Sequence, residues 1–278
     1  MIPVSAERVW RRWSVYLPFS RMKTAEWVQA LKAGDMMITV QISSRGHPWD
    51  TVFAVAEAVV PQAWMLTGGL MVQLHAMIGG LEVRPTTDVD LLVDLMSDHR
   101  GIESVQRVLS GRGFVAQPGT LTGYTTRMIG RDGGQVDLLV ADHLPGLLVK
   151  MAVLAGKPVL SMPAGAQARE RSMYVEIADG TMRATIRIPD LLGALMLKSA
   201  AYSVDHAGFG ERHLYDAAML VSLMGDPDAE RSRLHSKTDR KRMRTLFRLL
   251  REDSPYWDRL DREHKQSGLD AIQVLAGW

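Results

Sequence analysis

Two aspartates at alternate positions of one apolar strand are the first candidates for chemistry in this sequence. Asp88 and Asp90 stand in the run TDVDLLV at 87–93. Side chains alternate faces along a strand, so the two carboxylates project on the same side, about 7 Å apart. Such a pair repels unless a cation lies between its members, and Mg²⁺ or Mn²⁺ favours carboxylate oxygens. The alternative is an amphipathic edge strand with a polar outer face.

A third carboxylate stands in a second apolar strand, QVDLLV at 135–140. If this strand pairs beside the first, Asp137 completes a cluster of three acids. The third acid could help hold a second metal ion, or accept the proton of an attacking hydroxyl group. Taken alone, Asp137 is better explained as a residue at a strand edge or turn.

A glycine pair, Gly68-Gly69, follows a short apolar run and precedes a helical pattern. Paired glycines let backbone amides approach a phosphate, and the N-terminus of the following helix favours an anion. An ordinary turn from strand to helix would use the same residues.

Two charged residues interrupt otherwise apolar helical segments. Lys198 lies within 191–202 and Asp216 within 212–224. A charge in an apolar stripe is costly unless it is paired or used. The two residues could pair with each other, or Lys198 could reach the oxygens of a triphosphate as a cation.

The elements that must position these residues follow from hydrophobic periodicity and turn signals. Asp-Gly steps at 132–133 and 179–180 favour hairpins. The pattern predicts an α+β fold, with an N-terminal extension at 1–47, a core at 48–187 and a helical domain at 188–278. Strands are expected at 36–42, 63–66, 89–95, 114–116, 124–129, 135–140, 174–177 and 182–188. Helices are expected at 26–33, 49–60, 70–78, 102–109, 147–154, 191–202, 212–224, 231–251 and 256–275.

Composition excludes several classes of site. The chain has 278 residues and no cysteine, which rules out disulfides, thiolate zinc sites, iron–sulfur clusters and a cysteine nucleophile. No run reaches the roughly 18 apolar residues of a membrane span. No apolar core of a signal peptide follows the N-terminal arginines. We therefore expect a cytoplasmic protein with no membrane partner.

The net charge of +2 conceals an uneven distribution. Residues 231–251 hold nine Lys or Arg and one acid, a local charge of +8, which leaves −6 on the other 257 residues. A basic helix there would suit a phosphate backbone. Its candidate nucleic-acid-binding residues are Arg240, Lys241, Arg244 and Arg248. The alternative is a solvated basic face paired with acids elsewhere.

The order of these motifs resembles the nucleotidyltransferase superfamily with the DNA polymerase β-like fold. Within it, the chain is similar to the AbiEii/AbiGii toxin family, which includes the MenT-type toxins. The resemblance covers about 64–223. The glycine pair and the run RPTTDVDL, which begins at Arg84, match the family's first motifs, and Lys198 and Asp216 occupy the places of its later ones. Two departures are the 18 residues between Gly69 and Asp88 and the loss of the first Asp of the later motif, which here reads RHLYD at 212–216.

The resemblance implies a mixed sheet with flanking helices, followed by a C-terminal helical bundle. It also implies an enzyme that binds a nucleoside triphosphate and Mg²⁺, and transfers a nucleotidyl group to a hydroxyl with release of pyrophosphate. Asp88 and Asp90, with Asp137 as third acid or base, would hold the metal. Asp216 would position Lys198 or the nucleotide. The phosphate contacts would come from Gly68, Gly69, Thr86, Lys198 and Arg84, the last of which could instead form a surface salt bridge.

The MenT-type toxins are associated with transfer onto tRNA 3′ ends. We therefore expect the toxin of a toxin–antitoxin or phage-defence pair, with an RNA acceptor and a cognate antitoxin as partners. One alternative is an antibiotic-modifying nucleotidyltransferase, which the basic helix disfavours because aminoglycosides are cationic. Another is a non-catalytic nucleotide-binding regulator, which the three retained aspartates disfavour.

Overall fold

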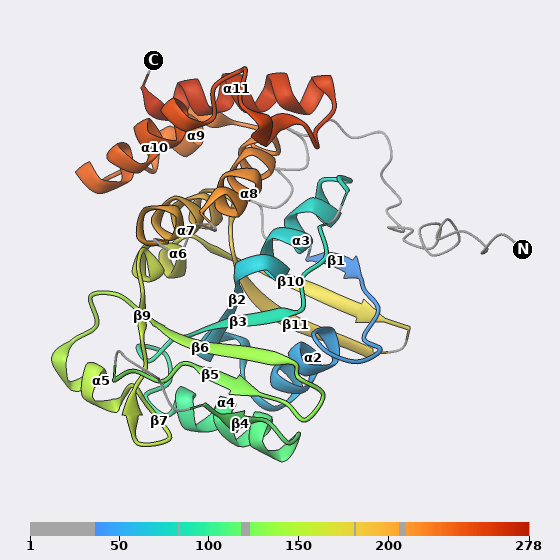
Figure 1. The fold of residues 1–278 in the computed structure, drawn as a ribbon, viewed down its shortest axis with the longest axis vertical. Coiled ribbons are helices and arrows are strands. Elements are labelled where there is room, and N and C mark those ends of the chain that lie inside the picture. The colour runs from blue at the N-terminus through green and yellow to red at the C-terminus, as the bar shows by residue number, and fades with distance from the viewer. Residues whose placement is uncertain (1–36, 83, 118–122, 181, 206–209, 278) are drawn as a thin grey trace, which may run out of the picture.

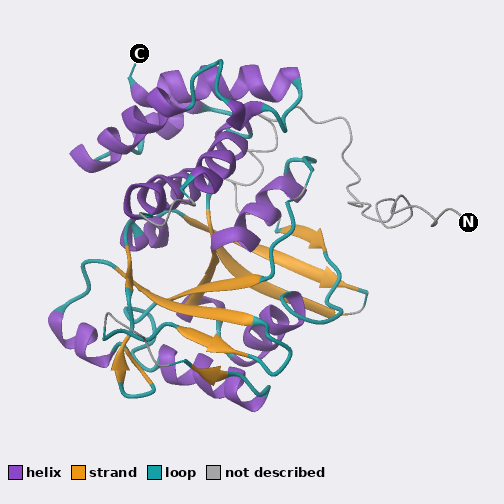
Figure 2. Ribbon diagram, in the orientation of Figure 1, coloured by secondary structure: helices purple, strands orange, loops and turns teal. Residues whose placement is uncertain are grey.

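The computed structural model describes residues 37–82, 84–117, 123–180, 182–205 and 210–277. The helix expected at 26–33 lies outside these ranges. Strands occupy the middle of the molecule, and the C-terminal helices gather at one end, opposite α4 (Figures 1 and 2). No helix in the described ranges combines the length and apolarity that crossing a membrane requires.

The larger sheet carries the strands that sequence analysis singled out. Its order is β2-β3-β6-β5-β4, and β9 pairs with the end of β6. β3 and β6 are parallel, whereas β2 is antiparallel to β3, and β5 to β6. The strands are β2 (Trp64–Thr67), β3 (Asp88–Val93), β4 (Val115–Ala116), β5 (Arg127–Ile129), β6 (Gln135–Ala141) and β9 (Ser161–Met162). Residues alternate along β3 and β6, so Val89, Leu91, Val136 and Leu138 enter the core while the aspartates between them stay partly exposed.

A second sheet joins distant parts of the chain. It contains β1 (Ile38–Gln41), β10 (Ser172–Asp179) and β11 (Met182–Pro189). β1 runs parallel to β10, and β10 and β11 form the expected hairpin. β11 also lies against β2, so the two sheets share one core. A separate small hairpin consists of β7 (Val153–Leu154) and β8 (Lys157–Pro158).

Helices cover the sheets because each presents an apolar stripe. In α4, Ile102, Val105 and Leu109 recur at helical spacing and are buried. The helices of this part are α2 (Trp49–Ala58), α3 (Gly68–Ile78), α4 (Gly101–Gly111), α5 (Gly146–Met151) and α6 (Gly165–Glu170), with a 3₁₀ turn η2 (Pro61–Ala63). The expected helix at 147–154 ends early, because its last residues pair in β7.

From residue 191 onward every described element is helical. α7 begins after Asp190, whose side chain accepts a hydrogen bond from the Gly193 amide at 2.8 Å. The elements are α7 (Leu191–Val204), α8 (Glu211–Ser222), α9 (Pro227–Ser232), α10 (Lys237–Leu249), η3 (Pro255–Trp257) and α11 (Arg262–Ala276). The α+β class with mixed sheets is therefore confirmed. The domain boundaries at 47 and 187 stay predictions.

The prediction of a single helix at 231–251 is wrong. α9 ends at Ser232, and α10 starts after Ser236 with a capping box in which Ser236 and Asp239 bond each other's backbone amides. Asp239 also forms a buried ion pair with Arg171 at 2.9 Å, which fixes α10 to the sheet-bearing part of the chain. Likewise, the helix expected at 256–275 is divided into η3 and α11, because Asp261 caps α11.

Candidate active site

One pocket of about 360 Å³ brings together the residues predicted to carry chemistry. It lies between β3 and β6 on one side and α7 and α8 on the other. Nine predicted residues line it: Gly68, Gly69, Arg84, Thr86, Asp88, Asp90, Asp137, Lys198 and Asp216. The segments that supply them are separated by up to 148 positions, yet they converge on one space.

The carboxylates come together through strand register. β3 and β6 pair in parallel with Asp90 opposite Asp137. Asp88 lies two residues earlier on the same face of β3. The expected pairing of the two strands is therefore present, and all three acids line the pocket.

This crowding disfavours the ionised form of Asp90. Burial, the neighbouring charge of Asp137 and a smaller contribution from Asp88 together raise the pKa of Asp90 to about 6. The ammonium group of Lys198 acts in the opposite direction. A bound cation would remove the repulsion between the carboxylates.

Arg127 is a pocket residue that sequence analysis missed. Its Nε and Nη2 donate to the two carboxylate oxygens of Asp137, at 3.0 and 2.7 Å. This bidentate bond raises the pKa of the Arg127 guanidinium. The predicted hairpin was one residue out of register: a turn at 131–134 would place Met128 opposite Asp137, whereas in the structure Gly130 bonds to Gly134 and Arg127 lies opposite Asp137.

The glycine pair allows the start of α3 to approach the carboxylates. Gly68 has φ +64, and a Cβ atom there would lie 1.7 Å from Asp90 Oδ2. A Cβ on Gly69 would lie 2.9 Å from the Thr86 hydroxyl. Thr67 adds a hydrogen bond from its hydroxyl to the Asp90 carbonyl, at 3.1 Å. Only glycine at 68 leaves both the backbone conformation and the space that this approach requires.

Gly68→Ala is expected to destabilise the fold by about 2–4 kcal/mol, because it combines backbone strain with a collision against Asp90. Urea denaturation measures the change. Gly80→Ala is the matched control, since Gly80 also has positive φ but has open space around its Cβ position. That control should cost only about 1 kcal/mol. Equal effects of the two substitutions would show that Gly68 makes no critical approach to Asp90.

The opposite wall of the pocket is a buried charge network. Lys198 Nζ lies 2.8 Å from Asp216 Oδ2, and both side chains are less than a tenth exposed. Arg84 Nη2 approaches Asp216 Oδ1 at 3.5 Å from a more exposed position. The pairing of Lys198 with Asp216, one of the two alternatives, is thus present. Both residues also line the pocket, so the pair can face a bound anion.

His213 also lines the pocket, within the RHLYD segment at 212–216. Burial, with the positive charges of Lys198 and Arg212, lowers the pKa of His213 to about 4. Its Nδ1 atom is buried and has no hydrogen-bond partner among the described residues. The imidazole is therefore neutral at neutral pH.

The carboxylates fit a divalent ion that is shared with a substrate. Within the described ranges, no three His, Cys, Asp or Glu side chains are grouped closely enough to enclose a metal ion by themselves. Mg²⁺ usually takes one or two carboxylates together with substrate phosphates. Asp88 and Asp90 match that pattern, and a cation beside Asp90 would offset the burial and repulsion that raise its pKa. Arg127 competes for both oxygens of Asp137.

The four predicted nucleic-acid-binding residues lie outside this pocket, on α10. Arg240, Lys241, Arg244 and Arg248 are exposed, and none has a carboxylate within 4 Å in the part of the chain that is described. Arg240, Arg244 and Arg248 are spaced four apart, so they share one face. Two other cations of the basic segment point elsewhere: Arg233 pairs with Asp190, and Arg242 donates to Gln167.

Comparison of this chain with protein-family models, curated proteins and solved structures gave no match.

Proposed function

We propose that this chain is a Mg²⁺-dependent nucleotidyltransferase that transfers a nucleotidyl group from a nucleoside triphosphate to an acceptor hydroxyl. The observation that carries the proposal is the convergence of three aspartates, a glycine-started helix and a buried lysine on one pocket. The motif order that resembles the polymerase β-like AbiEii/AbiGii toxins supports the same conclusion.

The pocket offers positive charge on the side opposite its carboxylates. A triphosphate would accept hydrogen bonds from the amides at the start of α3, beside Gly68 and Gly69, where the helix dipole favours an anion. Lys198 and Arg84 both pair with Asp216, and they would also neutralise the negative charge of phosphate oxygens that enter the pocket. Thr86 would add a hydroxyl donor. Transfer of this kind depends on positioning and charge neutralisation more than on covalent participation by the protein.

The proposed step forms one bond and breaks one. The acceptor hydroxyl oxygen bonds to the α-phosphorus, the bond from that phosphorus to the β-phosphate oxygen breaks, and pyrophosphate leaves. The hydroxyl proton passes to a carboxylate, for which Asp137 is the candidate. Asp88 and Asp90 would hold Mg²⁺, which supplies charge neutralisation on the phosphate oxygens.

The acceptor that best suits the exposed cations of α10 is an RNA, and we propose the 3′ end of a tRNA. An enzyme that blocks that end would act as a toxin and would need a cognate antitoxin. The purified protein should be incubated with Mg²⁺, total RNA and each labelled nucleoside triphosphate, beside Asp88→Ala. Label in tRNA with the unmodified protein alone supports the proposal. Label that enters a small molecule instead would favour the antibiotic-modifying alternative.

Arg240→Ala/Arg244→Ala is expected to weaken RNA binding about tenfold and to reduce the salt dependence of binding, because each arginine displaces counterions from the backbone. Fluorescence anisotropy at several salt concentrations measures both. Arg45→Ala/Arg107→Ala is the matched control, since it removes the same charge from exposed positions outside α10. If both double variants weaken binding equally, only net charge matters and α10 is not the RNA-binding face.

A further inference from the structure

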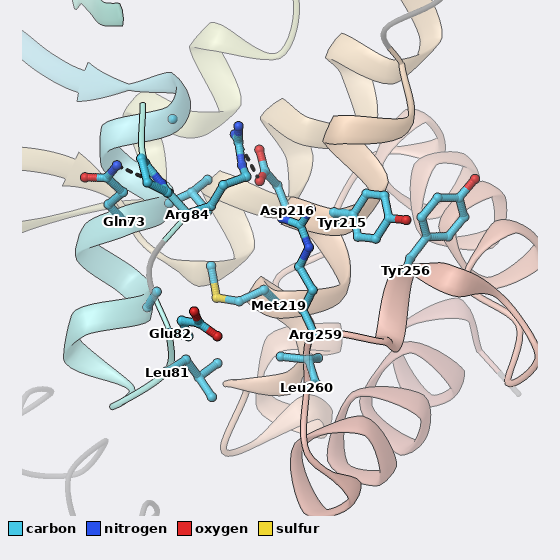
Figure 3. Close-up of a pocket in the computed structure, with 14 residues that line it drawn as sticks. Gln73, Leu81, Glu82, Arg84, Tyr215, Asp216, Met219, Tyr256, Arg259 and Leu260 are labelled. Atoms are coloured by element: carbon cyan, nitrogen blue, oxygen red, sulfur yellow. Dashed lines mark hydrogen bonds and ion pairs between the residues drawn. The ribbon is translucent and has the colours of Figure 1, made fainter. Parts of the chain in front are cut away.

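A second cavity, of about 430 Å³, adjoins the proposed active site. The two share Gly69, Arg84 and Asp216 as lining residues, so the Arg84–Asp216 pair stands at their common wall. Figure 3 shows the cavity between α3 on one side and α8 with the η3–α11 segment on the other. The proposed function does not use this space.

One wall of the cavity is aromatic and carries a cation. The rings of Tyr215 and Tyr256 meet edge to face, with centroids 5.1 Å apart. The guanidinium of Arg259 lies 4.9 Å from the centre of the Tyr215 ring. In Figure 3 the Arg259 side chain extends past Met219 toward Tyr215 and Asp216. Such planar groups stack with flat, polarizable ligands.

The rest of the lining is apolar with an acidic rim. Val72, Ala76, Met219 and Leu260 supply apolar surface. Glu82, an exposed residue before the start of β3, adds a carboxylate. The carboxylates of Glu82 and Asp216 offset the charges of Arg84 and Arg259, so the lining as a whole does not favour a phosphate. It also disfavours a purely apolar ligand, because Arg259 and Glu82 would lose hydration without gaining a partner.

We propose that this cavity binds a nucleobase, with the ring against the Tyr215–Arg259 wall and an amino group of the base donating to Glu82. The inference rests on the proposed function, because the cavity opens beside the residues proposed to hold the triphosphate. A carboxylate accepts from the exocyclic amino groups of adenine, cytosine or guanine, which uracil lacks. The base belongs either to the nucleoside triphosphate or to the end of the acceptor RNA, and the two sources give different results below.

Two variants test the inference without removing a residue of the proposed catalytic pocket. Met219→Trp fills the cavity, and Met219→Leu is its control of similar volume. Glu82→Gln removes the rim charge at an exposed position where folding is not at risk. Calorimetry with Mg²⁺ measures the affinity of each protein for tripolyphosphate and for the four nucleoside triphosphates. Transfer assays measure KM for RNA.

If the cavity holds the base of the triphosphate, at least one nucleoside triphosphate binds the unmodified protein tenfold or more tightly than tripolyphosphate does, and UTP binds weakest. Met219→Trp then lowers the best affinity about tenfold and leaves tripolyphosphate binding unchanged. Glu82→Gln reduces the discrimination against UTP. If the cavity holds the acceptor base, nucleotide affinities stay constant and KM for RNA rises about tenfold in Met219→Trp and also rises in Glu82→Gln.

The inference is overturned if both variants leave every nucleotide affinity and the KM for RNA within twofold of the unmodified protein. In that case the proposed function stands. If neither tripolyphosphate nor any nucleoside triphosphate binds the unmodified protein, the proposed function fails and the inference fails with it. The two failures are therefore distinguishable by one set of titrations.

Discussion

Asp90→Asn is expected to abolish nucleotidyl transfer and, at the same time, to stabilise the folded protein at neutral pH. Loss of the carboxylate removes a proposed ligand of Mg²⁺, and we expect transfer to fall at least 10³-fold. Loss of the charge relieves its repulsion from Asp137 and Asp88. A residue kept for function at a cost in stability would show this combination.

The sign of the stability effect follows from the pKa of Asp90. It is about 6 in the folded protein, against 3.8 for the ordinary side chain. An acid whose pKa is raised by folding costs nothing while it is protonated in both states, below pH 4. The cost develops as pH rises toward 6 and is complete above it. Asp90→Asn should therefore add about 1–3 kcal/mol at pH 7.5 and little at pH 4.

Thermal unfolding at pH 4 and pH 7.5, without and with Mg²⁺, measures this effect. Mg²⁺ should raise the Tm of the unmodified protein at pH 7.5 and leave that of Asp90→Asn unchanged. Asp253→Asn, which alters an exposed aspartate outside the pocket, is the control and should behave as the unmodified protein. A lower Tm for Asp90→Asn at pH 7.5 would show that the Asp90 carboxylate stabilises the fold.

Lys198→Met is expected to produce losses in both activity and stability. The substitution removes the ammonium group and leaves the buried Asp216 carboxylate with the more distant Arg84 as its ion-pair partner among the described residues. Breaking a buried ion pair from one side costs about 3 kcal/mol, because the remaining charge stays out of water. Transfer should fall at least 100-fold, since one cation proposed to neutralise the triphosphate is lost.

A double-mutant cycle separates the structural role of this pair from its proposed catalytic role. Lys198→Met/Asp216→Asn should recover much of the stability that Lys198→Met loses, because no unpaired charge remains. Transfer should stay low in the double variant. Lys237→Met, at an exposed lysine, should change the free energy of unfolding by less than about 0.5 kcal/mol. Transfer that recovered together with stability would show that Lys198 serves the fold alone.

Local pattern was enough to predict most of the elements around the site. Alternation along 87–93 and 135–140 predicted both strands and the faces of their aspartates, because burial on one side imposes a period of two. The glycine pair predicted the start of a helix. The structure shows why position 68 is glycine: a Cβ atom there would collide with the Asp90 carboxylate.

Features that depend on distant residues could not be predicted in the same way. The short strand β9 exists through its pairing with β6, and the second cavity exists because the η3–α11 segment brings Tyr256 and Arg259 against Tyr215. Neither β9 nor this cavity produces a periodic pattern in the sequence. The division of the basic segment into α9 and α10 could have been predicted from the sequence, however, because Ser236 and Asp239 form a standard capping pair that marks a helix start.

The position of the label in the nucleoside triphosphate tests the central claim most directly. The unmodified protein should be incubated with Mg²⁺, tRNA and the triphosphate labelled either at the α-phosphate or at the γ-phosphate. We predict that α-label enters the tRNA with one pyrophosphate released for each nucleotide added, and that γ-label leaves in the pyrophosphate. Transfer of γ-label to the tRNA, or entry of α-label at an unchanged rate with Asp88→Ala, would contradict the account.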